Sequence, residues 1–531
     1  MNRHALDVLQ FGDALDQVAR FAVSAPGAAA VRGLEPSDAP AWITDELGRV
    51  DETRRFLVRT GAALVPPIPD LKQAFRHIAV EGSSLEAIVL RDVAVLLSGA
   101  AATRRAIQAE SAAFPGLARI GSRLQAPRGL EDAIRAAIDD AGEVKDNATR
   151  ALARLRREIR GTRGRLVQKL EQFMAALPDR IQVADSSVSL RDGRYVIPVR
   201  REGRVEVGGL VHDESATGQT LFMEPPLAIE AMNRLRELER EEMREVQRIL
   251  QQLTDSLRPH REALQETLSA LIELDSLYAR ARYAAGIDGH CPDLVDGSGG
   301  FEVVNGRHPL LLATDAAVVP FDLRLDPEER VLLISGPNTG GKTVLLKAIG
   351  LLSALTQAGV IGPVGDGTRL PVFTDVFADI GDEQSIEASL STFSAHLRNQ
   401  REVLENAGAG TLVLMDEMGS GTDPVEGAAL ARSILLELVA RGALTFATTH
   451  LGELKALAAE SPAVVNASLQ FDAAELRPTY RLAKGVPGRS YGLAIARRLG
   501  LPGTVLARAE AAMPKGERDL AVLLDEMEQK D

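Results

Sequence analysis

Cysteine is almost absent from this chain of 531 residues, because Cys291 is the only one. An intramolecular disulfide framework is therefore excluded, and a reducing compartment fits. The sequence also contains no run of about 18 apolar residues, which a membrane-spanning helix would need. The N-terminal residues MNRHALDVLQFGDALDQVARF contain acids and polar residues where a signal peptide needs an unbroken apolar core. We therefore expect a cytoplasmic protein without a membrane partner.

An excess of positive charge is also missing from the chain as a whole. Lys and Arg total 61 against 74 Asp and Glu, which gives a net charge of −13. No overall positive field attracts nucleic acid, so any such contact must be local.

One segment does concentrate basic residues. Residues 150–204 hold 14 basic and 6 acidic side chains by count, a local charge of +8. Clustered cations of this kind favour contact with a phosphate backbone, although a solvated helix face is the alternative. Few aromatic residues lie among them, which argues against stacking on single-stranded bases. The predicted nucleic-acid contacts are Arg154, Arg157, Arg160, Arg163, Arg165, Arg194 and Arg200.

The spacing of apolar residues predicts a helical first part of the chain, followed by a small β segment between long helices. Residues 130–177 read as one long helix, because apolar residues recur at near-helical spacing without an internal proline. A hairpin follows with Asp192-Gly193 at its tip, and another strand is expected at 205–211. Helix resumes near Leu227 and runs toward Ala285, with one break near Pro259.

A phosphate-binding loop is the clearest chemical motif in the sequence. The residues GPNTGGKT stand between an apolar strand at 331–334 and a helical stretch at 344–352. Glycines in this pattern let backbone N–H groups surround phosphates, and the following helix N-terminus favours the negative charge. Lys342 is expected to reach the β- and γ-phosphates, and the Thr343 hydroxyl to bind Mg²⁺. The predicted nucleotide-binding residues here are Gly336, Pro337, Asn338, Thr339, Gly340, Gly341, Lys342, Thr343 and Val344.

Acidic residues and a histidine follow two further predicted strands. Residues 411–415 form an apolar run that delivers Asp416 and Glu417 at its carboxyl end, where open α/β sheets bind ligands. Asp416 is expected to help hold Mg²⁺, and Glu417 to orient and deprotonate the attacking water. A helix N-cap is the alternative for this acidic pair. His450 follows the strand at 444–447 and is predicted to sense the γ-phosphate, against the alternative of a structural histidine.

Four segments resemble, in the same order, the ATPase motifs of the MutS mismatch-repair family. They are GPNTGGKT (336–343), DIGDEQSIEASLSTFSAHL (379–397), LVLMDEMGSGTDPVEGAAL (412–430) and ATTH (447–450). Within the family, GDEQSIEASLSTFSAH and GVPGRSYGLAIARRLGLP resemble the second bacterial type, MutS-two. The chain also opens directly into helices, without room for the mismatch-reading and connector domains. The resemblance therefore does not support mismatch reading.

The resemblance implies a homodimer in which each subunit completes the nucleotide site of the other, as in ABC ATPases. In that arrangement Ser391 and Thr392 of the signature segment reach the γ-phosphate bound by the partner. Tyr480 matches the position whose aromatic ring stacks on adenine. One departure is Val318, which stands where the family has a second stacking aromatic, so Tyr480 is expected to stack alone.

The implied fold is a multidomain combination of all-α and α/β parts. It comprises a helical lever with coiled-coil arms and a small β-containing clamp tip, followed by an ABC-like P-loop ATPase domain and a helix-turn-helix. The expected domains are residues 1–130 (helical core), 131–178 (ascending arm), 179–226 (clamp tip), 227–298 (descending arm), 299–476 (ATPase), 477–513 (helix-turn-helix for dimerisation) and 514–531 (start of a C-terminal helix). Relatives of this type continue into KOW-like and Smr nuclease domains, so we expect a shortened chain or a natural loss.

These features predict an ATP-dependent, dimeric clamp on nucleic acid with ATP and Mg²⁺ as cofactors. The resemblance implies two substrates, namely branched double-stranded DNA in the restraint of recombination, and stalled or collided ribosomes in their rescue. A basic clamp fits DNA and ribosomal RNA equally, so this choice stays open. A structural ATPase whose arms bridge protein partners is the alternative. We expect no strong endonuclease activity, because no hydrolytic cluster appears outside the ATPase motifs.

Overall fold

A computed structural model describes residues 1–61, 65–296, 300–314, 317–336, 341–381, 389–472, 477–488, 493, 496, 497 and 499–512. The chain divides into two compact units. Unit 1 comprises Met1–Pro67, Ala106–Gly121 and Leu271–Asp531, and unit 2 comprises Ile68–Arg105 and Ser122–Ala270. Within the described part of the chain, no helix has both the length and the apolar character required to cross a membrane.

A six-stranded mixed sheet forms the centre of unit 1. Its strand order is β10 (Asp375–Asp379), β11 (Thr411–Met415), β12 (Leu444–Thr449), β8 (Val331–Ser335), β13 (Val464–Asp472) and β14 (Arg477–Lys484). Neighbouring strands are parallel except for β14, which pairs antiparallel with β13. The predicted strands before the phosphate loop, before Asp416 and before His450 are confirmed as β8, β11 and β12. Because these three strands are parallel neighbours, the residues that follow them meet at one edge of the sheet.

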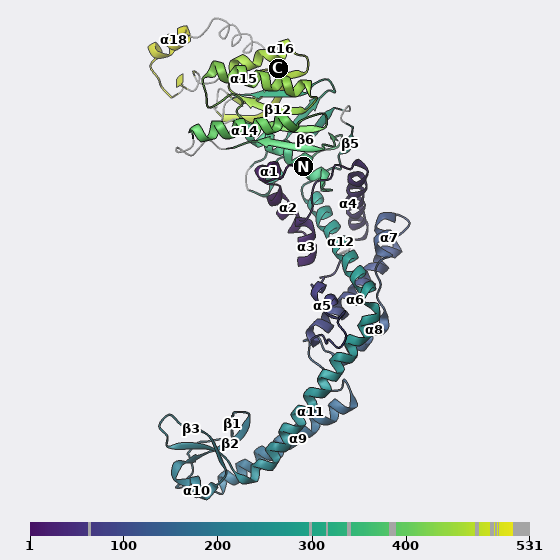
Figure 1. The fold of residues 1–531 in the computed structure, drawn as a ribbon, viewed down its shortest axis with the longest axis vertical. Helices are drawn as coiled ribbons and strands as arrows, with labels where there is room; N and C mark the ends of the chain where they lie inside the picture. The colour runs from purple at the N-terminus through teal and green to yellow at the C-terminus, as the bar shows by residue number, and fades with distance from the viewer. Residues whose placement is uncertain are drawn as a thin grey trace. The chain divides into compact units, whose positions relative to one another are not determined.

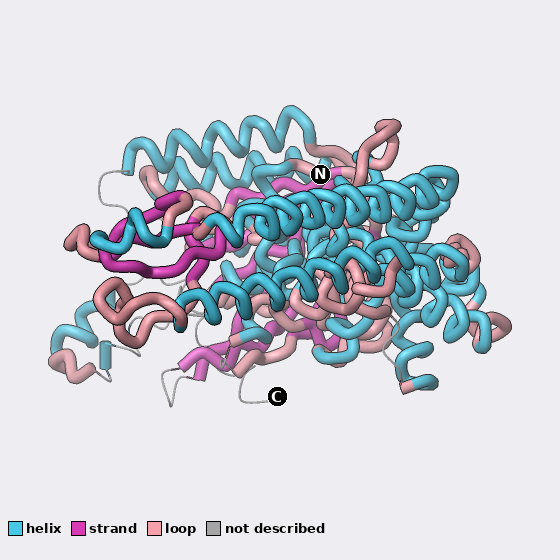
Figure 2. The backbone as a smooth tube through the Cα atoms, turned by 90° about the horizontal axis from the view of Figure 1, so that it is seen from below, coloured by secondary structure: helices cyan, strands magenta, loops and turns pink. Residues whose placement is uncertain are grey.

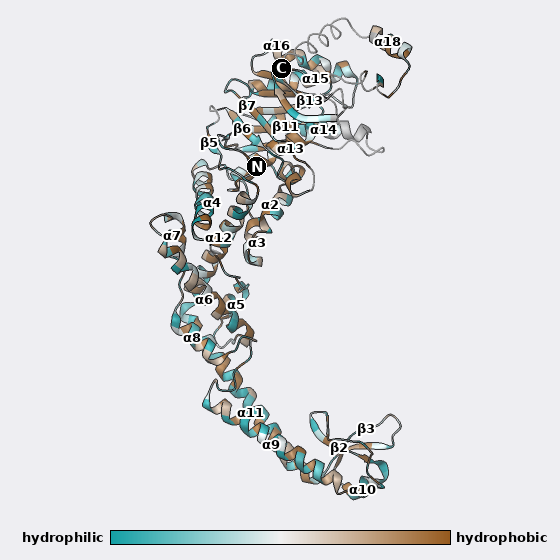
Figure 3. Cartoon of the chain, turned by 180° about the vertical axis from the view of Figure 1, so that it is seen from behind, coloured by the Kyte–Doolittle hydropathy of each residue, from teal (hydrophilic) through white to brown (hydrophobic). Residues whose placement is uncertain are grey.

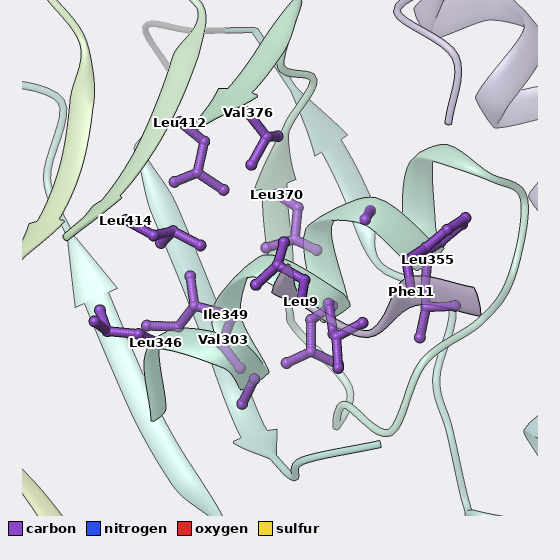
Figure 4. Close-up of a cluster of buried hydrophobic side chains, with 14 of the residues drawn as sticks. Leu9, Phe11, Val303, Leu346, Ile349, Leu355, Leu370, Val376, Leu412 and Leu414 are labelled. Atoms are coloured by element: carbon purple, nitrogen blue, oxygen red, sulfur yellow. The ribbon is translucent and has the colours of Figure 1, made fainter. Parts of the chain in front are cut away.

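Alternation along β11 explains how helices cover both faces of this sheet. Leu412 and Leu414 belong to one apolar cluster and Val413 and Met415 to another, since successive side chains point to opposite faces. Figure 4 shows Leu412 and Leu414 facing side chains of α13 (Lys342–Gln357), with Leu9 and Phe11 close by. The opposite cluster contains residues of α14 (Ser389–Asn406) and α15 (Pro424–Ala440). The P-loop helix is therefore buried on the opposite face from α14 and α15.

Smaller elements complete this part of unit 1. A second sheet has the order β5 (Asp293–Val295), β9 (Arg369–Pro371), β6 (Phe301–Gly306) and β7 (Phe321–Leu325). The remaining helical segments are η3 (Leu311–Ala313), η5 (Gly452–Ala456), α16 (Leu457–Glu460) and α18 (Gly503–Ala512). Figure 1 shows α14, α15 and α16 around the strands labelled β6 and β12.

The helical part of unit 1 contacts the end of the P-loop helix through buried charges. It contains α1 (Arg3–Val8), α2 (Phe11–Ala19), α3 (Ala25–Arg32), α4 (Pro40–Thr60), α7 (Pro115–Gly121) and most of α12 (Arg261–Gly286). Arg280 of α12 is only 2% exposed and forms an ion pair of 2.7 Å with Glu46 of α4. It also donates a hydrogen bond of 3.0 Å to the carbonyl oxygen of Gly359, just after α13. One buried guanidinium thus ties α4 and α12 to the segment that follows α13.

Unit 2 contains two long helices, α9 (Arg150–Ala175) and α11 (Pro226–Leu257), that pack against each other. Teal and brown residues alternate along both helices in Figure 3, as expected for an amphipathic pair. Outside the segment between these two helices, unit 2 also contains α5 (Lys72–His77), α8 (Arg128–Ala137), η2 (Arg258–His260) and the first parts of α6 (Ala87–Ala109) and α12. The predicted break near Pro259 is confirmed, because α11 ends at Leu257 and α12 begins at Arg261.

The prediction of one continuous helix over residues 130–177 is wrong. α8 ends at Ala137 and α9 begins at Arg150, with a short Ile138–Val144 β-bridge in the loop between them. Gly142 adopts a φ of +82°, and a Cβ atom there would lie 3.0 Å from Ile88, so the turn needs glycine. Thr149 then caps α9, since its hydroxyl accepts the N–H of Leu152.

A small sheet occupies the segment between α9 and α11, with the order β1 (Ser189–Arg191), β2 (Arg194–Arg200), β4 (Thr220–Glu224) and β3 (Leu210–Glu214). Figure 2 shows these strands in magenta beside the ends of two long helices. The hairpin prediction is confirmed, because Arg191 pairs with Arg194 around Asp192 and Gly193, whose φ angles of 48° and 72° fit a type I′ turn.

The strand predicted at 205–211 is largely wrong. α10 (Arg204–Val207), which follows η1 (Arg201–Gly203), occupies its first part, and β3 begins only at Leu210. Gly208 and Gly209 have φ angles of 64° and 90°, and a Cβ on Gly209 would overlap the carbonyl oxygen of Glu224. Two glycines in left-handed conformations therefore end the helical turn and delay the strand.

Candidate nucleotide-binding site

The phosphate loop connects β8 to α13, as its sequence predicted. Gly336 and Gly341 both adopt positive φ angles, of 146° and 81°, at the two ends of the loop. Pro337, Asn338, Thr339 and Gly340 lie outside the described residues. The Lys342 ammonium donates a hydrogen bond of 2.6 Å to the carbonyl oxygen of Gly336. Burial lowers the pKa of Lys342, while the carboxylates of Glu417 and Asp416 act in the opposite direction.

Asp416 joins the phosphate loop to two strand ends. Its Oδ2 accepts a hydrogen bond from the Thr343 hydroxyl, and its Oδ1 accepts one from the Thr448 hydroxyl at the end of β12. The Thr448 hydroxyl in turn accepts the backbone N–H of Glu417 at 2.8 Å. Thr343 and Asp416 thus present a hydroxyl and a carboxylate side by side, the kind of oxygen donors that Mg²⁺ prefers. These two predicted metal ligands therefore fit the ion.

Glu417 is held in an uncommon backbone conformation beside Asp416. Its φ of 50° lies in the left-handed region, which costs a non-glycine residue about 1–3 kcal/mol. The neighbouring Met418 N–H donates to the Thr448 carbonyl oxygen at 2.8 Å, which fixes the loop against β12. Hydrogen bonds to the next strand thus hold Glu417 in a strained conformation, and such strain clusters at functional sites. His450 follows β12 directly and is exposed.

An apolar pocket of about 240 Å³ opens next to the phosphate loop. Tyr480 and Val318 both line it, together with Gly341 and Val344. The Tyr480 ring lies close to Gly341, since a Cβ atom on that glycine would come within 3.0 Å of the ring. The structure therefore brings the predicted adenine-stacking tyrosine, the substituted Val318 and the loop to one cavity. The face of an aromatic base fits such a pocket.

Three residues of this site were not predicted from the sequence. Thr448 connects Asp416 to Glu417, and it lies in the ATTH segment where only the histidine was singled out. His308 lines the apolar pocket, and burial lowers its pKa to about 4, so its ring is neutral at physiological pH. His396 lies on α14 and contacts Asp379 at the end of β10. The fold brings these residues into the site through contacts with distant segments. The local sequence around each of them does not indicate such a contact.

The signature residues and the dimerisation segment are described only in part. Ser391 and Thr392 lie in the first turns of α14, but their side chains are outside the described residues. In the predicted helix-turn-helix segment at 477–513, residues 489–492, 494, 495, 498 and 513 are also outside them, as are residues 514–531. Neither prediction is therefore tested by the geometry.

The predicted nucleic-acid contacts fall into two groups, according to whether each arginine forms an ion pair within the described chain. Arg160 and Arg163 form ion pairs with Asp146 and Glu239. Arg194 pairs with the fully buried Glu224, which places it in the sheet rather than on a free surface.

Four other predicted contacts are not in ion pairs within the described chain. Arg200 donates to the carbonyl oxygen of Gln182. Arg154, Arg157 and Arg165 are exposed, and no acidic side chain among the described residues lies within ion-pair distance of them. At 3.6 residues per turn these three fall on one side of α9, which we call the outer stripe.

Comparison with known proteins identifies the family. Residues 332–516 match the family model for MutS domain V. An Endonuclease MutS2 from Gemmatimonas aurantiaca is 53% identical over 536 residues, which cover 100% of this chain and 65% of the relative. The Endonuclease MutS2 of Pelotomaculum thermopropionicum is 43% identical, covering 96% of this chain and 64% of the relative. That of Geobacillus sp. strain WCH70 is 40% identical, with coverage of 100% and 67%.

The chain spans about two thirds of the length of these relatives. The match to the Gemmatimonas aurantiaca relative covers this whole chain, and the family model spans the part that contains the phosphate loop, Asp416 and His450. On this evidence the chain belongs to the MutS2 family and contains the MutS ATPase domain.

Proposed function

We propose that the chain is an ATPase that hydrolyses ATP to ADP and phosphate with Mg²⁺. The observation that carries this proposal is the network around Asp416, which links the phosphate-loop Thr343 to the strand end that holds Glu417. The apolar pocket beside Gly341 would hold the base of the nucleotide. In this proposal the phosphate, metal and base follow one another near the carboxyl edge of the sheet.

Each residue of the site has a defined task in this proposal. Lys342 turns from the Gly336 carbonyl to the β- and γ-phosphates, while the loop N–H groups surround them. Thr343 and Asp416 would hold Mg²⁺, which when bound neutralises charge on the phosphate oxygens. Glu417 accepts a proton from the attacking water, and His450 contacts the γ-phosphate from the neighbouring strand end.

We propose further that two chains form a homodimer and that each site is completed in trans. The first turns of α14, with Ser391 and Thr392, would reach the nucleotide bound by the partner. Tyr480 would stack on adenine from the rim of the same pocket. The segment at 477–513 would hold the two chains together as a helix-turn-helix. The resemblance to the MutS family supports this arrangement.

The long helices suggest what the ATPase controls. We propose that α9 and α11 form a coiled-coil arm that ends in the small sheet as a clamp tip, and that ATP binding and hydrolysis close and open the clamp in the cytoplasm. The outer stripe of α9 supports nucleic acid as the substrate, because exposed arginines without acidic partners fit phosphates. Branched DNA and ribosomal RNA share this chemistry, so both remain substrates to test.

A structural ATPase whose arms bridge protein partners is the alternative function. The ion pairs of Arg156, Arg160 and Arg163 are compatible with it, but it gives no role to the outer stripe.

Endonuclease activity is another function to consider, because the relatives are named endonucleases. In the described residues of this chain, no group of three or more His, Cys, Asp or Glu side chains is arranged to hold a metal ion. We propose that this chain has no strong nuclease activity.

The Glu417→Gln variant tests the ATPase proposal. It should retain ATP binding, measured with a fluorescent ATP analogue, and lose about 100-fold or more in kcat, because the general base is lost. Glu426→Gln is the matched control, since Glu426 is an exposed acid at the start of α15 with no position in the site. Normal turnover by Glu417→Gln would remove Glu417 from the catalytic role.

A further inference from the structure

Asp379 is a buried residue that contacts both the strand end at Asp416 and helix α14. It is the last residue of β10 and only 3% exposed. Its carbonyl oxygen accepts the backbone N–H of Asp416 at 2.9 Å. The main chain of Asp379 is therefore fixed to the strand end that carries the catalytic acids.

The side chain of Asp379 contacts α14, which supplies polar partners for it. His396 Nδ1 lies 2.9 Å from Oδ1, and the Asn399 amide donates to the same oxygen at 3.0 Å. The Gln400 amide lies 3.4 Å from Oδ2. A buried carboxylate without hydrogen bonds would be costly, so these contacts hold α14 to β10.

The contacts occupy a defined position along α14. His396, Asn399 and Gln400 lie on the same helix face as Val403, which packs into the apolar cluster beneath the helix together with Ala407 just after its end. Packing thus anchors the second half of α14, and the Asp379 contacts anchor its middle. Ser391 stands five positions before His396, about 7.5 Å along the helix axis. His396 therefore anchors α14 close to the signature residues.

The same side chains border the catalytic loop. His396 and Gln400 line a small recess together with Asp416, Glu417 and Gly419. Gln400 also approaches the sulfur of Met418 at 4.0 Å. A shift of α14 would therefore move the side chains that lie beside Glu417 as well as the first turns of the helix.

We propose that His396 is a positioning residue for hydrolysis. It holds the Asp379 carboxylate and so fixes the first turns of α14, with Ser391 and Thr392, relative to the strand that carries Asp416 and Glu417. This inference rests on the proposed composite site, in which those first turns act on the nucleotide of the partner subunit. The imidazole acts here as a hydrogen-bond donor through Nδ1 and does not touch the nucleotide.

Three variants of the full chain test the inference. His396→Leu removes the donor and should lower kcat roughly tenfold to a hundredfold, the range for losing a hydrogen bond to a charged group. The KM for ATP should stay within about twofold, because the phosphate loop and the apolar pocket bind the nucleotide without α14. His396→Asn keeps a donor near the position of Nδ1 and should recover most of kcat. Arg401→Ala is the control, because among the described residues Arg401 pairs only with Glu405, on the exposed side of α14.

The outcomes separate this inference from the proposed function. A wild-type chain without ATP hydrolysis would overturn the proposed function and the inference with it. An active wild-type chain with normal kcat in His396→Leu would overturn the inference alone. Equal loss in His396→Leu and His396→Asn would also overturn it, because positioning through the Asp379 contact requires rescue by the amide. The thermal unfolding midpoint of each variant is measured as well. Equal midpoints show that a difference in kcat does not come from unfolding of the chain.

Discussion

Removing the three arginines of the outer stripe provides a quantitative test of the arm. The triple variant Arg154→Gln, Arg157→Gln, Arg165→Gln takes away exposed cations that span roughly 16 Å along α9. A duplex carries about ten phosphates over that length, so all three side chains can contact phosphate at once. The chain should fold normally, because none of the three side chains forms an ion pair in the described structure.

The expected loss follows from counterion release. Each lost phosphate contact should reduce the slope of log K against log salt by about 0.9, so three contacts reduce it by about 2.7. At about 0.15 M salt this corresponds to roughly 5-fold per contact and about 100-fold for the triple variant. Fluorescence anisotropy with a labelled four-way DNA junction, and in parallel with a ribosomal RNA duplex, measures both the affinity and the slope.

A matched variant on the same helix isolates direct contact from net charge. Arg156→Gln, Arg160→Gln, Arg163→Gln also lowers the charge by three, but these arginines are already paired with Glu242, Asp146 and Glu239. Because both triple variants change the long-range field equally, any difference between them reports phosphate contact. We expect the paired set to change the slope by less than about 1. Equal losses in the two variants would refute the assignment of the outer stripe.

Three further predictions concern single sites. Glu46→Ala should lower the free energy of unfolding by about 3–5 kcal/mol in urea titrations, because it leaves the buried Arg280 charge unpaired, and an unchanged midpoint would contradict this. Tyr480→Ala should weaken binding of a fluorescent ATP analogue about tenfold by removing one face of the apolar pocket, whereas unchanged affinity would place adenine elsewhere. The pKa of His308 is lowered from 6.5 to about 4 in the folded chain. Between these two pH values the unfolded chain therefore binds a proton at His308 more readily than the folded chain does. The free energy of unfolding should therefore fall by up to about 1.4 kcal/mol per unit as the pH drops from about 6.5 to about 4. The His308→Gln variant should lack this component, and identical pH profiles would contradict the assignment.

Local patterns predicted the elements that carry the chemistry. The apolar runs before Gly336, Asp416 and His450 are buried parallel strands, because continuous apolar sequence suits a strand covered on both faces. The turn at Asp192 and Gly193 was equally clear, since both residues accept the positive φ angles of a two-residue hairpin loop.

Features decided by distant contacts could not be predicted in this way. The break between α8 and α9 depends on Gly142, which passes close to Ile88 on another helix. Likewise β3 starts late because Gly209 meets the backbone at Glu224. The contact of His396 with Asp379 joins residues 17 positions apart on a helix and a strand, and no sequence period marks it.

Ion pairs within the folded chain also divide the basic residues that form one cluster in the sequence. The 14 basic residues between Arg150 and Arg204 appeared equivalent by composition. In the folded chain Arg194 is held by a buried glutamate and Arg163 by the neighbouring helix, whereas Arg154 and Arg157 are exposed. Partners for these arginines come from α11 and the small sheet, so only the fold separates structural from available cations.

Complementation between two inactive chains tests the composite site most directly. Lys342→Ala should abolish hydrolysis at the chain's own site, and Ser391→Ala should abolish it at the site of the partner. If the sites are shared, an equal mixture that exchanges subunits forms mixed dimers with one intact site, and about a quarter of the wild-type ATPase rate should return. A mixture that stays as inactive as the two separate variants would contradict a nucleotide site built from two subunits.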